Sequence, residues 1–215
     1  MEIKYSNIEP DNKVFQKYEL YGFYDKNSDY IANRISDISI IKYDDIKFVG
    51  SFLLYYGKKK RELLNSLKDE FKITKDIERK KMCELNSYEL ASVLFIKLAL
   101  SKAKVIILDH LDAYLNAADL KQLLLNIRSV ITSIDKPVIF VANRIDNIIQ
   151  NTNNYVIASE DRIIYNGKNI ESIHEKTEIM KFVDAANKKG ANLKYYKDPS
   201  DLLKAIYRSV QKWNI

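Results

Sequence analysis

Continuous apolar runs and helix-length amphipathic segments alternate along the chain. Two of the runs, Val105–Leu108 (VIIL) and Val138–Val141 (VIFV), contain no polar residue, a pattern typical of strands buried on both faces of a parallel sheet. Strands are expected at 17–21, 38–42, 46–49, 104–108, 138–142, 155–159 and 162–165. Helices are expected at 28–36, 58–71, 87–101, 117–133, 171–186 and 200–210. Because helix-length segments separate the strands, the pattern predicts βαβ units and a doubly wound α/β fold.

The stretch from Leu85 to Asn116 carries the most specific local signals. Asn86 followed by Glu89 predicts a capping box, in which the two side chains accept hydrogen bonds from each other's backbone amides. The helix that follows is apolar almost all round, which predicts a buried helix. The next buried strand ends in Asp109, at the edge where open α/β sheets place their ligands.

Length and composition are those of a globular chain. The 215 residues are 47% hydrophobic and 30% charged, enough for one α/β domain with a sizeable core, or for one domain with a small appendage. No apolar run approaches the roughly 18 residues of a membrane span. The start, MEIKYSNIEPDN, lacks the basic and apolar regions of a signal peptide. The expected location is therefore the cytoplasm, with a peripheral position at the inner face of the membrane as a variant.

The chain is basic and contains one cysteine. Its net charge is +6, and its Lys and Arg residues cluster at 58–61 and 79–81. Both clusters fall in expected helical regions and are interpreted as solvated helix surface, with a nucleic-acid-binding patch as the alternative. The single Cys83 cannot form an internal disulfide, and no metal site is expected. The 15 tyrosines are scattered, so they favour ordinary packing over base stacking.

A degenerate phosphate-binding loop is suggested near the N-terminus. A β-rich approach at 18–21 leads to Gly22 and then to a polar segment that opens a helical pattern. Counted from Gly22, the pattern G-x-x-x-x-G-K-[ST] places Asn27 at the second glycine, Ser28 at the lysine and Asp29 at the hydroxyl. An acidic group would repel a polyphosphate, and Asn27 or Ser28 can cap the helix instead. The later stretch GSFLLYYGKKK has the wrong glycine spacing and is discounted.

Taken in order, these segments resemble the ATP-binding cassette (ABC) ATPases, the nucleotide-binding subunits of ABC transporters. The correspondence runs over LNSYE (85–89) at the signature motif, VIILDH (105–110) at Walker B, AYLN (113–116) at the D-loop, FVGS (48–51) at the Q-loop strand, VIFVAN (138–143) at the switch strand, DRIIYNGK (161–168) at the closing hairpin and YELYGFYDKNSDYIANRIS (18–36) at the Walker A region. The Walker B segment is the most specific, and the shared order of all of them supports the resemblance.

The resemblance implies a P-loop NTPase-like ABC ATPase fold, with a mostly parallel sheet flanked by helices. The short chain predicts a reduced β-subdomain and a reduced helical subdomain. The expected core spans residues 1–168, with the helical subdomain at about 57–101, and a C-terminal α/β extension packed on the core spans 169–215.

Most catalytic positions of the family are changed. His110 stands at the catalytic glutamate, Asn143 at the switch histidine and Ser51 at the Q-loop glutamine. In the signature motif and the D-loop the positions are held by Asn86, Ser87, Tyr88 and Asn116. Only Asp109, with Gly22 as the lone loop glycine, keeps the identity that the family has. No catalytic residue is therefore expected.

The resemblance therefore implies a degenerate ABC transporter ATP-binding subunit, a pseudo-ATPase that no longer turns over ATP. Its expected partner is a membrane permease gripped near residues 51–61, together with an active ABC ATPase subunit or a second copy of the chain. No cofactor is expected. One alternative is a soluble scaffold or regulator that binds nucleic acid through its basic clusters, although nucleic acid is the less favoured partner. Another is a divergent active ATPase, which alone would need ATP and Mg²⁺ at Asp109.

Overall fold

The computed structural model describes residues 1–25, 31, 35–57, 60–159 and 162–213. Within this part of the chain, seven strands form one sheet in the order β3-β1-β4-β5-β2-β6-β7. The strands are β1 (Glu2–Ser6), β2 (Leu20–Asp25), β3 (Ile38–Ile40), β4 (Val105–Asp109), β5 (Val138–Val141), β6 (Asn154–Ser159) and β7 (Arg162–Gly167). The central strands β4, β5, β2 and β6 are parallel, and β1, β3 and β7 add antiparallel pairs at the two edges.

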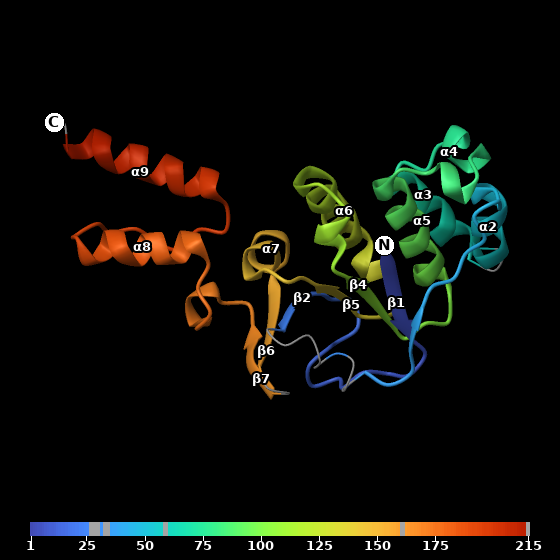
Figure 1. The fold of residues 1–215 in the computed structure, drawn as a ribbon, viewed down its shortest axis with the longest axis horizontal. Helices are drawn as coiled ribbons and strands as arrows, with labels where there is room; N and C mark the ends of the chain where they lie inside the picture. Colours follow the sequence, from blue (N-terminus) through green and yellow to red (C-terminus); the bar gives the residue numbers. More distant parts are fainter. Residues whose placement is uncertain (26–30, 32–34, 58–59, 160–161, 214–215) are drawn as a thin grey trace.

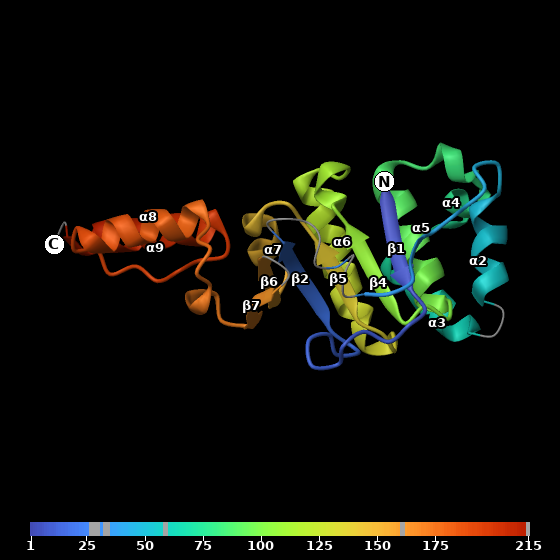
Figure 2. The same cartoon turned by 60° about the horizontal axis from the view of Figure 1, so that its bottom comes forward.

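Helices cover the sheet and extend past both of its edges (Figure 1). They are α2 (Val49–Gly57), α3 (Arg61–Glu70), α4 (Lys75–Arg79), α5 (Ser87–Leu100), α6 (Ala117–Val130), α7 (Ile145–Asn151), α8 (Glu178–Lys188) and α9 (Pro199–Trp213). Helices α2 to α5 gather on the β1 side, whereas α8 and α9 lie beyond β7 in both Figure 1 and Figure 2. Among the described residues, no helix is both long and apolar enough to cross a bilayer.

The central strands are buried on both faces, as the apolar runs predict. Ile106 and Leu108 of β4 belong to the main core, which they share with α5, α6 and α7. Val105 and Ile107 of the same strand belong to a second core on the opposite face. That second core includes Phe15, which precedes β2 in the chain. Alternate residues of β4 therefore pack on opposite sides, which explains why the strand contains no polar position before Asp109.

Helix α5 is the central buried helix, and its start is as predicted. The Asn86 Oδ1 atom accepts a hydrogen bond from the Glu89 amide at 2.8 Å, and a Glu89 carboxylate oxygen accepts one from the Asn86 amide at 3.1 Å. All residues from Ala91 to Leu100 are buried. The capping box satisfies two amides at the helix start, and the apolar circumference packs against its neighbours on all sides.

The region around residue 48 differs from the expected strand at 46–49. A turn leads into α2, and Phe48 forms only an isolated bridge with Lys81. The apolar run that follows has helical spacing, because Val49, Phe52 and Leu53 are buried together. The short strand β1 and the helices α4 and α7 were also not expected from the sequence pattern.

The C-terminal segment is helical. After β7, the described residues 168–213 form a short 3-10 turn, α8 and α9, with no strand, so the expected α/β character is wrong. Ile173 and Met180 belong to the main core, and the Lys197 ammonium donates a hydrogen bond to the Thr152 carbonyl oxygen at 3.1 Å. The division of the chain at residue 168 stays a prediction.

Candidate functional site

Asp109 ends β4, at the edge of the sheet where the sequence predicts a ligand site. It pairs in register with Val141, the last residue of β5. The next residue, His110, adopts a left-handed backbone with φ of 49°, which is uncommon outside glycine. Its amide donates to the Val141 carbonyl oxygen at 3.0 Å, and its Nδ1 lies 2.8 Å from Asp109 Oδ1. In this geometry the protonated Nδ1 donates, so one carboxylate oxygen of Asp109 is engaged by its own neighbour.

A lysine holds the other oxygen of Asp109. The Lys4 ammonium from β1 donates to Asp109 Oδ2 at 2.5 Å, with the Asp109 side chain 18% exposed and the Lys4 side chain 28% exposed. The hydrogen bond to Asp109 raises the pKa of Lys4, against a smaller opposing effect of burial. The antiparallel register of β1 and β4 produces this contact, because Glu2 pairs with Asp109 and Lys4 follows two residues later on the same strand face.

A cavity of about 550 Å³ opens beside this pair. Its polar lining includes Lys4, Asp25, Asp37, Asp109 and His110, and the rest of its wall is mainly apolar. The donor set does not fit a magnesium–triphosphate group. Asp109, which would hold the cation, already accepts bonds from an ammonium and an imidazole, and the other carboxylates would repel phosphate. Among the described residues, no group of three or more His, Cys, Asp or Glu side chains is placed to hold a metal ion.

Gly22 does not lie in a loop, so the expectation that it opens the phosphate-binding loop is wrong. It lies inside β2, where it pairs with Phe140 of β5 and Tyr155 of β6. A Cβ atom at this position would meet Thr152 Oγ1 at 2.3 Å and Ile148 Cγ2 at 2.4 Å. The glycine therefore allows α7 to approach the sheet.

Strand β2 continues through Asp25, past the position of Gly22 at which the sequence pattern placed its end. The predicted positions Asn27, Ser28 and Asp29 lie outside the described residues. Counted instead from Asp25, the last residue of β2, the phosphate-loop pattern assigns Ile31 to the lysine position. The Ile31 side chain packs against the second core. In either register the lysine that would neutralise a β- or γ-phosphate is absent.

The start of α5 is closed by its own side chains. Glu89, which completes the capping box, also accepts a hydrogen bond from the Lys80 ammonium at 2.8 Å. Ser87 is exposed at the first turn. Tyr88 turns toward α6, where its hydroxyl accepts a hydrogen bond from the Asn126 side chain at 3.0 Å. Burial raises the pKa of Tyr88. Tyr88 stands at a signature-motif position, and its side chain is held against α6.

The three remaining predicted positions lie on different elements. Asn143 is exposed and follows the end of β5 by two residues. The last residue of β5, Val141, pairs with Asp109. Asn116 caps α6, because its Oδ1 accepts a hydrogen bond from the Asp119 amide at 2.9 Å. Ser51 is exposed within α2, so it does not end a strand. The structure therefore brings together Asp109, His110 and the end of β5, while Ser51 lies within α2 and Asn86 caps α5.

Lys4 is the functional-site residue that sequence reasoning missed. The only available signal was the alternation of polar and apolar residues in EIKYS, which is short and contains charged residues at two of its three polar positions. Such a pattern is typical of a strand with one solvated face. Nothing local indicates that the polar face meets the carboxylate of a strand a hundred residues later in the chain.

Comparison with solved structures identifies the fold. The chain is similar to the ADP conformation of MJ1267, an ATP-binding cassette of an ABC transporter, with a TM-score of 0.56 and 12% identity over 89% of this chain and 100% of that chain. It is also similar to a nucleotide-free ATP-binding cassette from an ABC transporter (TM-score 0.52, 13% identity, 80% and 93% covered). A third similar structure is an inward-facing ABC transporter described as metal-chelate type (TM-score 0.50, 12% identity, 78% and 83% covered).

The sequence comparisons add nothing to this. No family model and no curated protein matches the chain. At these identities the structural likeness establishes the fold alone, which is that of an ABC ATPase.

Proposed function

We propose that this chain, which has the fold of an ATP-binding cassette, is a pseudo-ATPase that serves as a structural or regulatory partner of a membrane permease. The observation that carries the proposal is the pairing of Asp109 with Lys4 and His110. In a phosphoryl-transfer enzyme, an acid at this position would contribute to binding of Mg²⁺. Here an ammonium of the chain itself supplies the positive charge.

Replacement of Lys4 by a magnesium ion would be unfavourable. The ion would have to displace a short, charge-assisted hydrogen bond and leave a lysine near a divalent cation. His110 stands at the position of the family's catalytic glutamate and is hydrogen-bonded to Asp109, so it would lie next to a cation bound by that carboxylate. Both changes remove the electrostatic stabilisation on which phosphoryl transfer depends.

The start of α5, where the resemblance places the signature motif, supports the same proposal. Helix N-termini bind phosphate through unpaired amides. In α5 the side chains of Asn86 and Glu89 satisfy amides of the first turn, and Glu89 adds a negative charge next to the site. A phosphate would therefore meet capped amides and an acid, although Lys80 partly neutralises that acid.

The permease would dock on the α2 surface, which we define as Ile46, Phe48, Ser51, Leu54 and Tyr55. All five residues are exposed, with Tyr55 74% exposed and Phe48 50% exposed. The Lys47 ammonium lies 5.8 Å from the Tyr55 ring centroid. A group of large apolar side chains at the surface, next to a cation, is typical of a protein-binding surface. Ser51 stands at the family's Q-loop position, near which the resemblance implies a permease.

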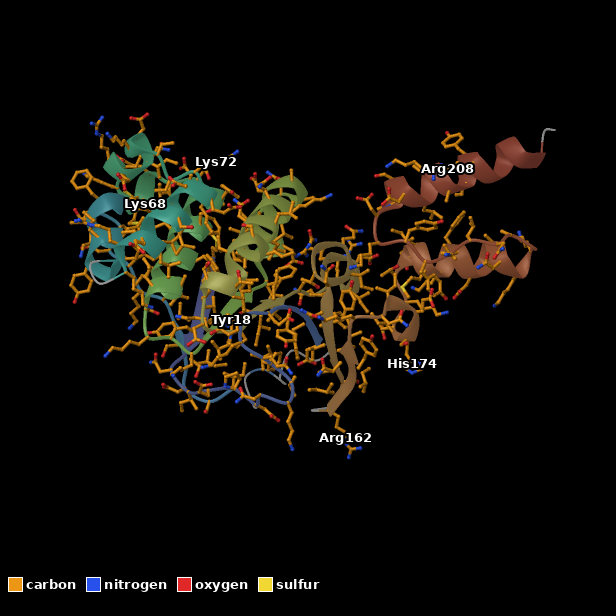
Figure 3. The ribbon with its side chains drawn as sticks, turned by 180° about the vertical axis from the view of Figure 1, so that it is seen from behind. Tyr18, Lys68, Lys72, Arg162, His174 and Arg208 are labelled. Carbon is orange, nitrogen blue, oxygen red and sulfur yellow. The ribbon has the colours of Figure 1, made fainter. Side chains whose placement is uncertain are left out.

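The nucleic-acid alternative is less favoured, because acids accompany the basic residues of the helical region. Lys80 pairs with Glu89 at 2.8 Å, and Lys68 pairs with Glu78. Lys68 and Lys72 lie at the same end of the molecule, as Figure 3 shows, and Arg208 lies at the other. These basic residues therefore lie at both ends of the molecule, which does not favour one basic patch for a nucleic-acid backbone.

Site-specific photocrosslinking tests the proposed partner. A benzophenone amino acid in place of Tyr55 is expected to crosslink, in native membranes, to a membrane protein with several spans. The same amino acid in place of Tyr207 on α9, which is also exposed at 69%, serves as the matched control and is expected to give no such product. Crosslinks from position 55 to soluble proteins or nucleic acid alone would contradict the permease assignment.

A further inference from the structure

The last helix, α9, exposes large apolar side chains to solvent. Together with α8 it extends away from the sheet beyond β7, as Figures 1 and 2 show. Leu202 is 7% exposed and Ile206 is half-buried, so one side of the helix faces the protein. Leu203 and Tyr207 are 55% and 69% exposed. Because they are four positions apart, these two residues lie on the same side of the helix, about one turn from each other.

A basic stripe runs beside the two exposed apolar residues. Lys204 and Arg208 are exposed, each directly follows one of the apolar residues in the chain, and Lys212 continues the same spacing in the sequence. The two stripes are therefore about 100° apart around the helix axis. Lys204 pairs with Asp201 at 3.1 Å, but both side chains are at least 60% exposed, so the pair is weak. Residues 202–215 contain no acid.

The C-terminal segment carries most of the net charge of the chain. Residues 185–215 contain seven lysine or arginine residues and two aspartates, which gives a net charge of +5, whereas the whole chain has +6. Residues 1–184 are therefore almost neutral overall. Such an asymmetry favours an anionic partner at this end of the molecule.

Helix α9 has the pattern of a helix that lies in the surface of a bilayer. It is strongly amphipathic without being apolar overall. In helices of this kind, apolar side chains enter the headgroup region of the lipid, and lysine or arginine on the neighbouring face binds anionic headgroups. A helix that used its whole apolar face for packing would bury Leu203 and Tyr207, but both are exposed here.

We propose that α9 binds directly to an anionic lipid bilayer, with Leu203 and Tyr207 in the headgroup region and Lys204 and Arg208 at the phosphates. The charges of the segment and of the bilayer are complementary. A nucleic acid would match the basic stripe, but it would leave Leu203 without an apolar counterpart. A second copy of the chain would cover the apolar residues, but it would bring two segments of charge +5 together.

This inference does not rest on the proposed role beside a permease. The surface proposed for the permease is on α2, and α2 and α9 lie at opposite ends of the molecule (Figure 1). Lipid is the only ligand proposed for α9, so its test needs no other protein. In the crosslinking experiment above, position 207 would label lipid and position 55 a membrane protein, so either proposal can fail without the other.

Co-sedimentation of the full-length chain with lipid vesicles tests the proposal. Binding is expected to vesicles of phosphatidylcholine with phosphatidylglycerol, and not to vesicles of phosphatidylcholine alone. The double variant Lys204→Gln/Arg208→Gln should weaken binding about tenfold or more, because each basic group near an anionic surface contributes about fivefold. The matched control Lys75→Gln/Arg79→Gln on α4 removes the same residue types at the same spacing from exposed positions, and it should leave binding within about twofold.

A second pair of variants tests the apolar part of the surface. Leu203→Gln/Tyr207→Gln should also weaken vesicle binding about tenfold or more, because two apolar groups no longer enter the lipid, while glutamine keeps a good helix propensity. The control Leu125→Gln/Tyr114→Gln changes the same residue types at positions that are 45% and 50% exposed, and it should leave binding within about twofold. Circular dichroism compares the helix content of each variant with that of the parent.

The single tryptophan of the chain reports the position of α9. Trp213 is the last residue of this helix. Phosphatidylglycerol-containing vesicles with brominated acyl chains should quench its fluorescence, whereas brominated phosphatidylcholine alone should not. If vesicles bound the chain without quenching Trp213, α9 would not be the part that lies in the bilayer surface, and the proposal would be wrong.

The other occupants of this surface have distinct outcomes. A gel shift with duplex DNA that Lys204→Gln/Arg208→Gln abolishes, without vesicle binding by the parent, would assign the basic stripe to nucleic acid. A dimer in lipid-free solution that Leu203→Gln/Tyr207→Gln dissociates, again without vesicle binding, would assign the apolar residues to a second copy. Either result, an absence of vesicle binding, or an equal loss of binding in variants and controls would overturn the proposal.

Discussion

Lys4 at the carboxyl end of β4 and the pair Lys97 and Lys136 at its amino end are lysines of one α/β core with opposite surroundings. Lys4 meets the carboxylate of Asp109 at 2.5 Å, and this hydrogen bond raises its pKa. Lys97 and Lys136 meet backbone carbonyl oxygens, and burial lowers the pKa of both. The site expected to hold a cation therefore contains its own positive charge, whereas the lysines at the amino end lie where burial disfavours their charged form.

The two ends are also expected to depend on pH in opposite ways. Lys4 has a raised pKa, so its stabilising contribution is fully present below the ordinary lysine value and is lost as the pH rises through its pKa in the folded protein. Lys136 has a lowered pKa, so its charged form opposes folding at neutral pH, and this cost disappears as the pH rises above about 8. A hydrogen bond to a carboxylate raises the pKa of Lys4 and burial lowers that of Lys136, so the sign of the effect reverses for the same residue type.

The largest effect is expected from Gly22→Ala, which tests whether the carboxyl end of the sheet is built for packing or for phosphate. The new methyl group would come within 2.4 Å of Thr152 and Ile148, so α7 must move, at a cost of about 3 kcal/mol or more in the free energy of unfolding. Urea denaturation measures this cost. The control Gly167→Ala, where the nearest atom is the end of the Tyr165 side chain, should cost less than about 1 kcal/mol. If the Gly22 variant and the parent were equally stable, the close packing of this glycine against α7 would be contradicted.

Lys136→Met should remove the pH dependence of the amino end. The pKa of Lys136 is about 8 in the folded protein against an ordinary value of 10.5, so the unfolded chain binds more protons between these values and stability rises with pH. From about pH 7.5 to about pH 9.5 the parent should gain about 2 kcal/mol relative to the variant. Urea titrations at the two pH values measure this difference. The range stays below pH 10, because burial raises the pKa of Tyr155 to about 12 and ionisation of the unfolded tyrosine then reverses the trend. Parallel curves for parent and variant would refute a lowered pKa.

A double-mutant cycle measures the coupling at the carboxyl end. Asp109→Asn leaves the half-buried Lys4 without its charged partner and is expected to cost about 1 to 2 kcal/mol. Lys4→Met alone leaves Asp109 without its cation, and the double variant should be more stable than the two single costs predict. A coupling energy near zero would mean that the ion pair does not contribute in solution.

The sequence carried enough information for the central strands and for one end of the site. VIIL and VIFV became β4 and β5, Asp109 ended its strand, and Asn86 with Glu89 formed the capping box, because each depends on local spacing. Gly22 was misassigned, because a glycine inside a strand and a glycine that opens a loop leave the same local signal. The contact between Lys4 and Asp109 joins residues 105 positions apart. Such contacts depend on register between strands, which short patterns do not specify.

The smallest effect is expected for His110→Glu, which restores the carboxylate found at this position in the family. The new acid would lie next to Asp109 and share Lys4 with it, which raises one of the carboxyl pKa values. Steady-state assays of phosphate release should remain at background, because Ser28 and Asp29 still stand at the lysine and hydroxyl positions of the phosphate-loop pattern. The melting temperature should be unchanged or lower. Clear turnover by this single variant would show that the carboxyl end retains a working nucleotide pocket.

Binding of magnesium–ATP by the unaltered full-length chain tests the central claim most directly. A nucleotide at a hundredfold excess over its dissociation constant stabilises a folded protein by about 2.7 kcal/mol. With Lys4 and His110 on the two oxygens of Asp109, we expect urea denaturation to give the same free energy of unfolding with and without millimolar magnesium–ATP. Stabilisation of that size, lost on addition of a magnesium chelator, would contradict the pseudo-ATPase account.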